Sequence, residues 1–469
     1  MAPVRLRGAE DKQVKWLVWL AAPALAALAS CEPANPQADL SDTPYDVPVG
    51  EERERISEGV RVSYPGMPEN VVGMLTNVRR QVGDNARCEL VEWMAAPGSG
   101  GNATVVALSR RMVDFCALGI GDISAASAGK RLDGATFRFD VAGDELTMLA
   151  HSSEPAVDVC CSLQLAMTRL GDSDFWAARR RLGGIDRAML SLFVVKDERT
   201  PEADILTFHG PDAPAGPHQI AEDQLAGQLF DRELASKALG ETRKVRIYLP
   251  PGWSKEKTWP AIFLADNSAN MYAPMVEAMI LAGEIKPIVL ISAESGKRAV
   301  IGVAPTEYGA DLRSAEYIRY RDGAGDRFDQ HMEFFSAELT RYAEREFGAS
   351  ARREDRVVAG YSSGGVFALW AGLLHPDVYA YAIPMSPGIA PISASDLAPG
   401  VRARFRFAGG LYEPHFLETA KAAEAVLTQG GYDASGLYLS AGHDPEQWRI
   451  VMHAALLEIF PPAHGKTAQ

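Results

Sequence analysis

The hydrophobic pattern divides the chain into two regions of different character. In residues 60–210 apolar and polar residues alternate in short runs, such as Ala135 to Val141 and Met189 to Val195, with Gly, Asp and Ser clusters between them. Alternation with a period of two predicts strands buried on one face, so we expect a β-rich, sandwich-like N-terminal module. Two stretches, Val72 to Arg80 and Ser173 to Leu182, are also compatible with helices.

Residues 225–462 alternate strands with helices instead. The continuous apolar runs Ala261 to Ala265 and Ile288 to Ser292 are typical of parallel strands buried on both faces. From Asp329 to Phe347 apolar residues recur every three or four positions, which predicts an amphipathic helix that stops at Gly348. The pattern predicts an α/β fold, a mostly parallel sheet flanked by helices, whose ligands bind beyond the carboxyl ends of the strands.

Two further segments indicate a domain boundary and a signal peptide. The stretch from Thr207 to Pro217 is rich in turn-forming residues, and we place the domain boundary there. Residues 1–30 combine several basic residues with the apolar run Trp16 to Ala29. At about 1.5 Å per residue this run spans roughly 21 Å, short of the roughly 30 Å hydrocarbon core of a bilayer. It therefore indicates a signal peptide rather than a permanent transmembrane helix.

The apolar run ends at Leu28-Ala-Ser-Cys31, which resembles the lipobox of bacterial lipoproteins. On this interpretation Cys31 becomes the lipidated first residue of an exported periplasmic or cell-envelope lipoprotein, which meets the membrane only through this anchor. Simple secretion without lipidation is the alternative. Residues 31–59, rich in Pro, Asp, Ala and Glu, are expected to form a flexible tether.

The other cysteines all lie in the N-terminal module, at Cys88, Cys116, Cys160 and Cys161. In an oxidising compartment they are candidates for disulfides, and their pairing does not follow from the sequence. Buried free thiols are the alternative. The spaced Cys and His pairs of a zinc site do not occur in the sequence, so we expect no metal.

The composition is that of an ordinary globular protein. The chain has 469 residues, 47% hydrophobic and 23% charged, and 47 Lys+Arg against 61 Asp+Glu give a net charge of -14. This length is sufficient for more than one core. Because the sequence contains no dense cluster of basic residues, electrostatic binding to a nucleic acid is excluded.

The motif Gly360-Tyr-Ser-Ser-Gly364 carries the most specific chemical signal. It follows the apolar run Arg356 to Ala359 and opens a predicted helix from Ser363 to His375. This is the context of the G-x-S-x-G nucleophile elbow, in which a serine lies in a strained turn with its hydroxyl exposed. Glycines two positions before and after it let the strand and the helix approach closely. We therefore predict Ser362 as a nucleophile, with a Gly-rich turn of no catalytic role as the alternative.

A serine hydroxyl needs a base, and a histidine must supply it. His443 follows the predicted strand Leu437 to Ser440 in a loop, at the sheet edge where active-site loops gather. In contrast, His375, His453 and His464 lie at a helix end, within a helix and in the C-terminal tail. We expect His443 to be the base.

The carboxylate that orients this base should follow the strand between the two residues. Glu413 comes just after the predicted strand Arg404 to Ala408 and gives the order serine, acid, histidine. It would fix the imidazole tautomer and stabilise the imidazolium. Glu418 and Asp433 are the competing candidates.

Backbone N–H groups are expected to bind the charge that develops on the substrate carbonyl oxygen. One belongs to Ser363, at the start of the nucleophile helix. The other belongs to Asn267 or Ser268, in the loop after the first parallel strand.

From residue 225 to about 460 these segments resemble the esterase D and enterochelin esterase group of α/β-hydrolases. The runs that carry the likeness are Val245 to Pro251, Phe263 to Asp266, Arg313 to Tyr317, Gly360 to Gly365, Ala408 to Glu413 and Gly442 to Arg449. The resemblance implies an α/β-hydrolase fold with Ser362, Glu413 and His443 as the triad, and Trp448 and Arg449 near the mouth of the site.

Two comparisons with this family concern parts of the chain outside the triad. Enterochelin esterases carry a β-sandwich before the hydrolase domain, and residues 150–210 are similar to it in outline. Where the family usually has Asp-Gly after the oxyanion strand, this chain has Asp266-Asn267. Asparagine tolerates the left-handed backbone conformation.

These observations predict a serine carboxylic-ester hydrolase that works through an acyl-enzyme, without metal or organic cofactor, on a small-molecule ester. The resemblance implies enterobactin-like siderophore lactones, with Arg449 or Arg313 at their anionic rings and Tyr361 beside them. For Arg313, an ion pair with Glu316 is the structural alternative. Acetyl or feruloyl esters of polysaccharides are alternative substrates, and a non-catalytic envelope binding lipoprotein is the alternative function.

Overall fold

The structure is a computed structural model that describes residues 116–195, 205–296, 312–319 and 326–462, apart from residues 118, 156, 164 and 391. The chain forms two compact units, Met1–Pro211 and Asp212–Gln469. The predicted signal peptide, Cys31, the tether and Cys88 lie outside the described residues.

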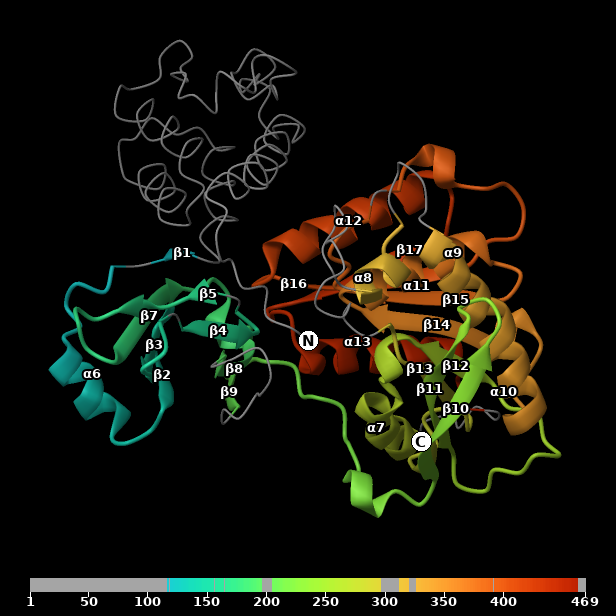
Figure 1. Cartoon of the computed structure of the whole chain (residues 1–469), viewed down its shortest axis with the longest axis horizontal. Coiled ribbons are helices and arrows are strands. Elements are labelled where there is room, and N and C mark those ends of the chain that lie inside the picture. The colour runs from blue at the N-terminus through green and yellow to red at the C-terminus, as the bar shows by residue number, and fades with distance from the viewer. Residues whose placement is uncertain are drawn as a thin grey trace, which may run out of the picture. The chain divides into compact units, whose positions relative to one another are not determined.

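In the N-terminal unit the described residues form two antiparallel sheets and one helix, as the alternating pattern predicts (Figure 1). Helix α6 packs Ala128 and Leu132 against Leu149 and Ala177. The elements are β1 (Cys116–Ala117), α6 (Ala125–Leu132), β2 (Phe137–Ala142), β3 (Glu145–His151), β6 (Thr168–Arg169) and β7 (Phe175–Arg181), with the second sheet formed by β4 (Asp158–Cys161), β5 (Leu165–Ala166), β8 (Met189–Val195) and β9 (Leu206–His209).

Three sequence expectations in this unit can be compared with the structure. The helical alternative for Ser173 to Leu182 is wrong, because strand β7 occupies the segment and pairs with β3. Cys160 is disulfide-bonded. Thr207 to His209, at the start of the predicted linker, pairs with β8 instead.

The C-terminal unit is built on an eight-stranded sheet in the order β10-β11-β13-β12-β14-β15-β16-β17. Strands β10 and β11 are antiparallel to their neighbours, and those from β13 to β17 run parallel. The strands are β10 (Gln228–Ser236), β11 (Glu241–Leu249), β12 (Ala261–Leu264), β13 (Val289–Ala293), β14 (Arg356–Tyr361), β15 (Tyr381–Met385), β16 (Arg404–Gly410) and β17 (Ala434–Leu439).

Helices cover both faces of this sheet, as Figure 1 shows. Strand β12 alternates between two apolar cores: Ala261 and Phe263 pack into one, and Ile262 and Leu264 into the other. The α-helices and the π-helix η5 are α7 (Ala269–Leu281), α8 (Leu312–Tyr317), α9 (Asp326–Glu333), η5 (Phe334–Leu339), α10 (Thr340–Phe347), α11 (Ser363–Leu374), α12 (Pro414–Gln429) and α13 (Pro445–Ile459). In the described part of the chain no helix is long and apolar enough to span a membrane.

The long amphipathic segment ends where the sequence predicts. Helix α9, η5 and α10 follow one another to Phe347, and Gly348 closes the last turn with φ +69°. Its N–H bonds back to the carbonyl of Glu344. A left-handed residue at this position satisfies the free carbonyls of a helix end, which is why glycine stops the helix.

Candidate active site

Ser362 lies in the strained turn that its motif predicts. It follows β14 and precedes α11 with φ +56° and ψ -128°, a conformation that residues other than glycine rarely adopt. A Cβ on Gly364 would lie 2.8 Å from Oδ2 of Asp266, and one on Gly365 would lie 2.5 Å from the carbonyl oxygen of Met385. Glycines are therefore required for the helix to start this close to the strands.

The two oxyanion candidates lie at neighbouring sheet ends. Ser363 is the first residue of α11, so its N–H has no acceptor within the helix and lies at the positive end of the helix dipole. After β12, Asp266 and Asn267 adopt φ +62° and +54°, which confirms the left-handed conformation at the asparagine. The N–H of Asp266 already donates to Oη of Tyr317 at 2.9 Å, so Asn267 and Ser268 remain as second donors.

Glu413 and His443 form a close buried pair. Oε2 of Glu413 lies 2.6 Å from Nδ1 of His443, and the two residues are 5% and 4% exposed. They follow adjacent parallel strands, β16 and β17. An ionised carboxylate can only accept a hydrogen bond, so Nδ1–H of neutral His443 is the donor and the Nε2 nitrogen is left with its lone pair.

The second carboxylate oxygen of Glu413 accepts three hydrogen bonds from neutral donors. They come from Oγ of Ser386 at 2.6 Å, the N–H of Gly410 at 2.7 Å and Nε2 of Gln447 at 2.6 Å. Neither Ser386 nor Gln447 was predicted from the sequence. Ser386 directly follows strand β15 and has φ +44°. Its position at the carboxyl end of a parallel strand, where active-site residues gather, could have indicated Ser386 from the sequence.

Trp448 does not line the substrate-binding surface, contrary to the sequence-based expectation. Its side chain is fully buried at 0% exposure, and its indole N–H donates to Oγ of Ser386 at 2.8 Å. Its ring stacks on Tyr361 at 4.2 Å and meets the ring of His443 edge-on at 5.0 Å. Trp448 therefore packs beneath the pair formed by Glu413 and His443.

Contacts between aromatic rings connect the turn that carries Ser362 with the ring of His443. Tyr361 precedes Ser362 and contacts Trp448, which in turn contacts His443. In this structure no hydrogen bond joins the hydroxyl of Ser362 to the ring of His443, both of which are described residues. Catalytic hydrogen bonds are often long in unliganded enzymes and shorten when substrate is bound.

The competing acids lie elsewhere. Asp433 precedes β17, at the end opposite His443, and pairs with Arg406 at 2.9 Å. Glu418 is an exposed residue of α12. Glu413 is therefore the candidate carboxylate in contact with the histidine.

The two candidate substrate arginines differ. Arg313 donates to the carboxylate of Asp266 from Nε at 2.6 Å and from Nη2 at 2.8 Å, so the alternative of an ion pair with Glu316 is wrong. Burial, the largest single influence, would lower the pKa of Arg313, but the hydrogen bonds to Asp266 and the negative charge of Asp266 together outweigh it and raise that pKa. Arg449 is half-buried and forms no ion pair with any residue in the described segments.

Tyr361 is partly exposed beside the elbow, and burial raises its pKa, so the phenol stays neutral at ordinary pH. In the described part of the chain no group of His, Cys, Asp and Glu side chains is arranged to hold a metal ion.

Comparison with known proteins finds a matching family and solved structures of the same fold. Residues 236–466 match the family described as "Putative esterase". The enterobactin esterase from Shigella flexneri with 2,3-di-hydroxy-N-benzoyl-glycine is 17% identical, with a TM-score of 0.51 over 70% of this chain and 98% of that chain. The same esterase in the presence of enterobactin gives 18% identity and a TM-score of 0.51 over 73% of this chain and 99% of that chain.

A ferulic acid esterase from Anaeromyces mucronatus is 14% identical, with a TM-score of 0.44 over 52% of this chain and 95% of that chain. The matches to the Shigella protein extend over more of the chain than residues 212–469 supply, so they include part of the β-rich N-terminal unit. At these identities the matches show the fold alone.

Proposed function

We propose that residues 236–466, which match the family described as "Putative esterase" and have the α/β-hydrolase fold, form a carboxylic-ester hydrolase domain. In this proposal the domain works as a serine esterase with Ser362, His443 and Glu413 as its triad. The observation that carries the proposal is the buried contact of 2.6 Å between Glu413 and His443. It lies at the same sheet edge as the strained turn of Ser362.

Each group has a step in acyl transfer. With Nδ1–H donated to Glu413, Nε2 of His443 takes the proton of Ser362 as Oγ bonds to the carbonyl carbon of the ester. The carbonyl oxygen then carries a negative charge, which the N–H of Ser363 and a second N–H from Asn267 or Ser268 stabilise. Collapse of this intermediate breaks the ester bond, and the departing alcohol takes the proton from His443.

Deacylation repeats the sequence with water. Nε2 of His443 takes a proton from the water, whose oxygen bonds to the carbonyl carbon of the acyl group on Ser362. The ester bond to Oγ breaks, the carboxylic acid leaves and Ser362 recovers its proton. Throughout, Glu413 stays ionised and stabilises the imidazolium.

For the substrate we favour lactone-linked esters of the enterobactin type, whose anionic aromatic rings would meet Arg449 and the ring of Tyr361. The Shigella esterase of the same fold is described with enterobactin and with dihydroxybenzoyl compounds. Arg449 supports the choice because it has no ion-pair partner among the described residues. Polysaccharide acetyl or feruloyl esters are the second candidate.

The test of the reaction compares wild type with Ser362→Ala on p-nitrophenyl acetate. We expect Ser362→Ala to lose at least about 10⁴-fold in kcat, while Ser395→Ala, an exposed serine of the same unit, keeps wild-type activity. Equal rates for wild type and Ser362→Ala would refute the proposal and favour a non-catalytic binding protein. The substrate is tested by comparing kcat/KM on enterobactin with that on a feruloylated sugar.

We also propose that the protein is an exported lipoprotein anchored at Cys31. The supporting observation is the sequence Leu28-Ala-Ser-Cys31 after an apolar run. In a bacterial host the full chain should partition into the detergent phase of Triton X-114, and Cys31→Ala should move it to the aqueous phase. Aqueous partitioning of both forms would contradict lipidation.

A further inference from the structure

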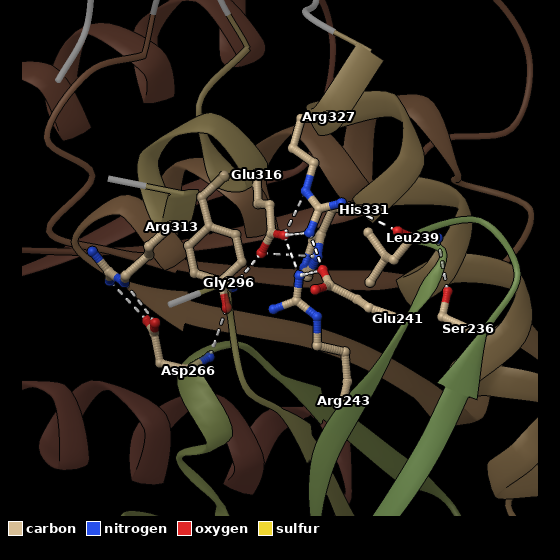
Figure 2. Close-up of polar contacts among 11 residues, drawn as sticks. Ser236, Leu239, Glu241, Arg243, Asp266, Gly296, Arg313, Glu316, Arg327 and His331 are labelled. Atoms are coloured by element: carbon tan, nitrogen blue, oxygen red, sulfur yellow. Dashed lines mark hydrogen bonds and ion pairs between the residues drawn. The ribbon is translucent and has the colours of Figure 1, made fainter. Parts of the chain in front are cut away.

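Helix α8 holds one residue of the oxyanion loop at two points. The guanidinium of Arg313 donates two hydrogen bonds to the carboxylate of Asp266, at 2.6 and 2.8 Å, and Figure 2 shows the two groups facing each other. From the last position of the same helix, Oη of Tyr317 accepts the N–H of Asp266 at 2.9 Å. The side chain and the main chain of Asp266 are thus both fixed from one short helix.

This loop needs such support. Asp266 and Asn267 both have positive φ, a conformation that costs on the order of 1–3 kcal/mol per residue and persists only when the surroundings impose it. The N–H of Asn267 and that of Ser268 are the candidates for the second oxyanion donor. A small rotation at Asp266 would change the direction of both.

The carboxylate of Asp266 also lies where a negative charge is unfavourable. A Cβ on Gly364, in the first turn of the nucleophile helix, would be 2.8 Å from Oδ2 of Asp266. An unpaired carboxylate at this place would oppose the negative charge that forms on the substrate oxygen. The two parallel hydrogen bonds from Arg313 neutralise it and fix its orientation.

Helix α8 is itself anchored in the core by Glu316, which has no exposed surface. As Figure 2 shows, its carboxylate meets Arg243 of β11 and Arg327 of α9. It also accepts the N–H of Gly296 at 2.5 Å. The ring of the next residue, Tyr317, packs against Phe367 of the nucleophile helix at 5.3 Å.

We propose that Arg313 and Tyr317 are positioning residues, which hold the Asp266–Asn267 loop so that it presents the second oxyanion donor and which neutralise Asp266 beside it. This role replaces the substrate contact predicted for Arg313. The inference rests on the proposed serine-esterase mechanism.

The first experiment compares wild type, Arg313→Met and a double variant on p-nitrophenyl acetate. Arg313→Met leaves the Asp266 charge unpaired, and we expect kcat to fall about 30- to 100-fold with KM within about threefold. Asp266→Asn combined with Arg313→Met removes both charges, and asparagine tolerates positive φ. The double variant should recover at least about tenfold in kcat relative to Arg313→Met. Equal kcat in the two variants would overturn the electrostatic part of the inference.

Tyr317→Phe is the conservative second variant, since it removes only the oxygen that accepts the N–H of Asp266. We expect kcat to fall about tenfold, the loss of one hydrogen bond. An alkyl trifluoromethyl ketone separates positioning from a purely structural role, because its adduct with Ser362 places an oxyanion at the same donors. The Ki of this inhibitor should rise in Arg313→Met and in Tyr317→Phe in proportion to the fall in kcat/KM, while KM stays nearly constant.

The matched control is Arg246→Met. Arg246 makes a bidentate pair with Asp231 at 2.7 and 3.1 Å, between strands β10 and β11. It has the same geometry as the Arg313 pair but no contact with the oxyanion loop through its side chain. We expect kcat and Ki within twofold of wild type, whatever the change in melting temperature.

The outcomes separate the inference from the mechanism on which it rests. If Ser362→Ala is inactive while Arg313→Met and Tyr317→Phe keep kcat and Ki within twofold of wild type, the positioning role is refuted and the triad stands. If Ser362→Ala is as active as wild type, the mechanism itself fails.

Discussion

Two buried glutamates in the C-terminal unit have opposite environments. Glu413 is 5% exposed and Glu316 is 0% exposed. Besides His443, Glu413 meets only neutral donors: a serine hydroxyl, an amide and a backbone N–H. Glu316 meets the guanidinium groups of Arg243 and Arg327.

This difference shows why one carboxylate suits catalysis and the other suits structure. Neutral donors leave the net negative charge of the Glu413 carboxylate in place, so it can stabilise a positive imidazolium. The charge of Glu316 is already neutralised by arginines, so it holds elements together and has no charge left for a reaction. Burial alone would not have distinguished them.

The histidines beside the two glutamates also differ in their environments. His443 shares a short contact with its carboxylate. His331 is completely buried, neither of its ring nitrogens has a hydrogen-bond partner, and Nδ1 lies 3.5 Å from Oε2 of Glu316. Burial, and then the charges of Arg243 and Arg327, lower the pKa of His331 well below its ordinary value. His331 is therefore a neutral core residue.

The largest expected effect concerns the catalytic glutamate. Glu413→Gln should lower kcat on p-nitrophenyl acetate by about 10³- to 10⁴-fold, because the amide neither fixes the tautomer of His443 nor stabilises its charge. The melting temperature should change little by comparison. Asp433→Asn, a competing acid paired with Arg406, is the control and should stay within twofold. If the Glu413→Gln enzyme had a near-normal kcat, Glu413 would be a structural residue like Glu316, and its catalytic role would be refuted.

The structural glutamate should show the reverse. Glu316→Gln removes the buried negative charge that the buried Arg243 and the partly exposed Arg327 share, and we expect the free energy of unfolding to fall by about 3–5 kcal/mol. Urea unfolding measures it, with Glu346→Gln, at the surface, as the control. The folded variant should lose far less kcat than Glu413→Gln. Unchanged stability would contradict the structural role.

A smaller effect is expected at Ser386, which the sequence analysis missed. Ser386→Ala removes the hydroxyl that donates to Glu413 and accepts from Trp448. We expect kcat to fall about 10- to 30-fold, as for one hydrogen bond to a charged group. Ser386→Thr keeps the hydroxyl and should be closer to wild type than Ser386→Ala. If the two variants lose equally, the hydrogen bond is not the cause.

The smallest effect is a pH dependence of stability from His331. Because its folded pKa lies well below the ordinary 6.5, the unfolded chain takes up a proton below pH 6.5 that the folded protein does not. Stability therefore falls as the pH drops through this range. Between about pH 7 and 5.5, wild type should lose about 1 kcal/mol more than His331→Phe. Equal losses would mean that His331 is protonated in the folded protein.

The positions of the site residues on the backbone could be predicted because the sequence patterns that mark them are local. The strand, the glycines and the helix around Ser362 occupy one continuous segment, and Glu413 and His443 each follow an apolar run. Parallel strands bring such positions to one sheet edge whatever lies between them. The helix stop at Gly348 follows from a local pattern of the same kind.

The contacts between side chains were not predictable in this way. Gln447 and Ser386 are 61 positions apart, and only the fold brings both to Glu413. Glu316 is three positions from Arg313, but it points into the core toward Arg243, so Arg313 pairs with Asp266, which is 47 positions away in sequence.

The error at Trp448 has a different cause. Trp448 was placed near the mouth of the site by resemblance alone. Trp448, Val451, Met452 and Ala455 share the buried face of α13. Spacings of three and four residues on a helix indicate burial, and this signal in the sequence would have corrected the assignment.

The most direct test of the central claim is to identify the residue that a fluorophosphonate modifies, by mass spectrometry of the digested protein. We predict a single adduct on Ser362, absent in Ser362→Ala, formed much more slowly in His443→Ala, and appearing in step with the loss of esterase activity. An enzyme that loses activity with the adduct on another residue, or that keeps full activity with Ser362 fully modified, would contradict the account.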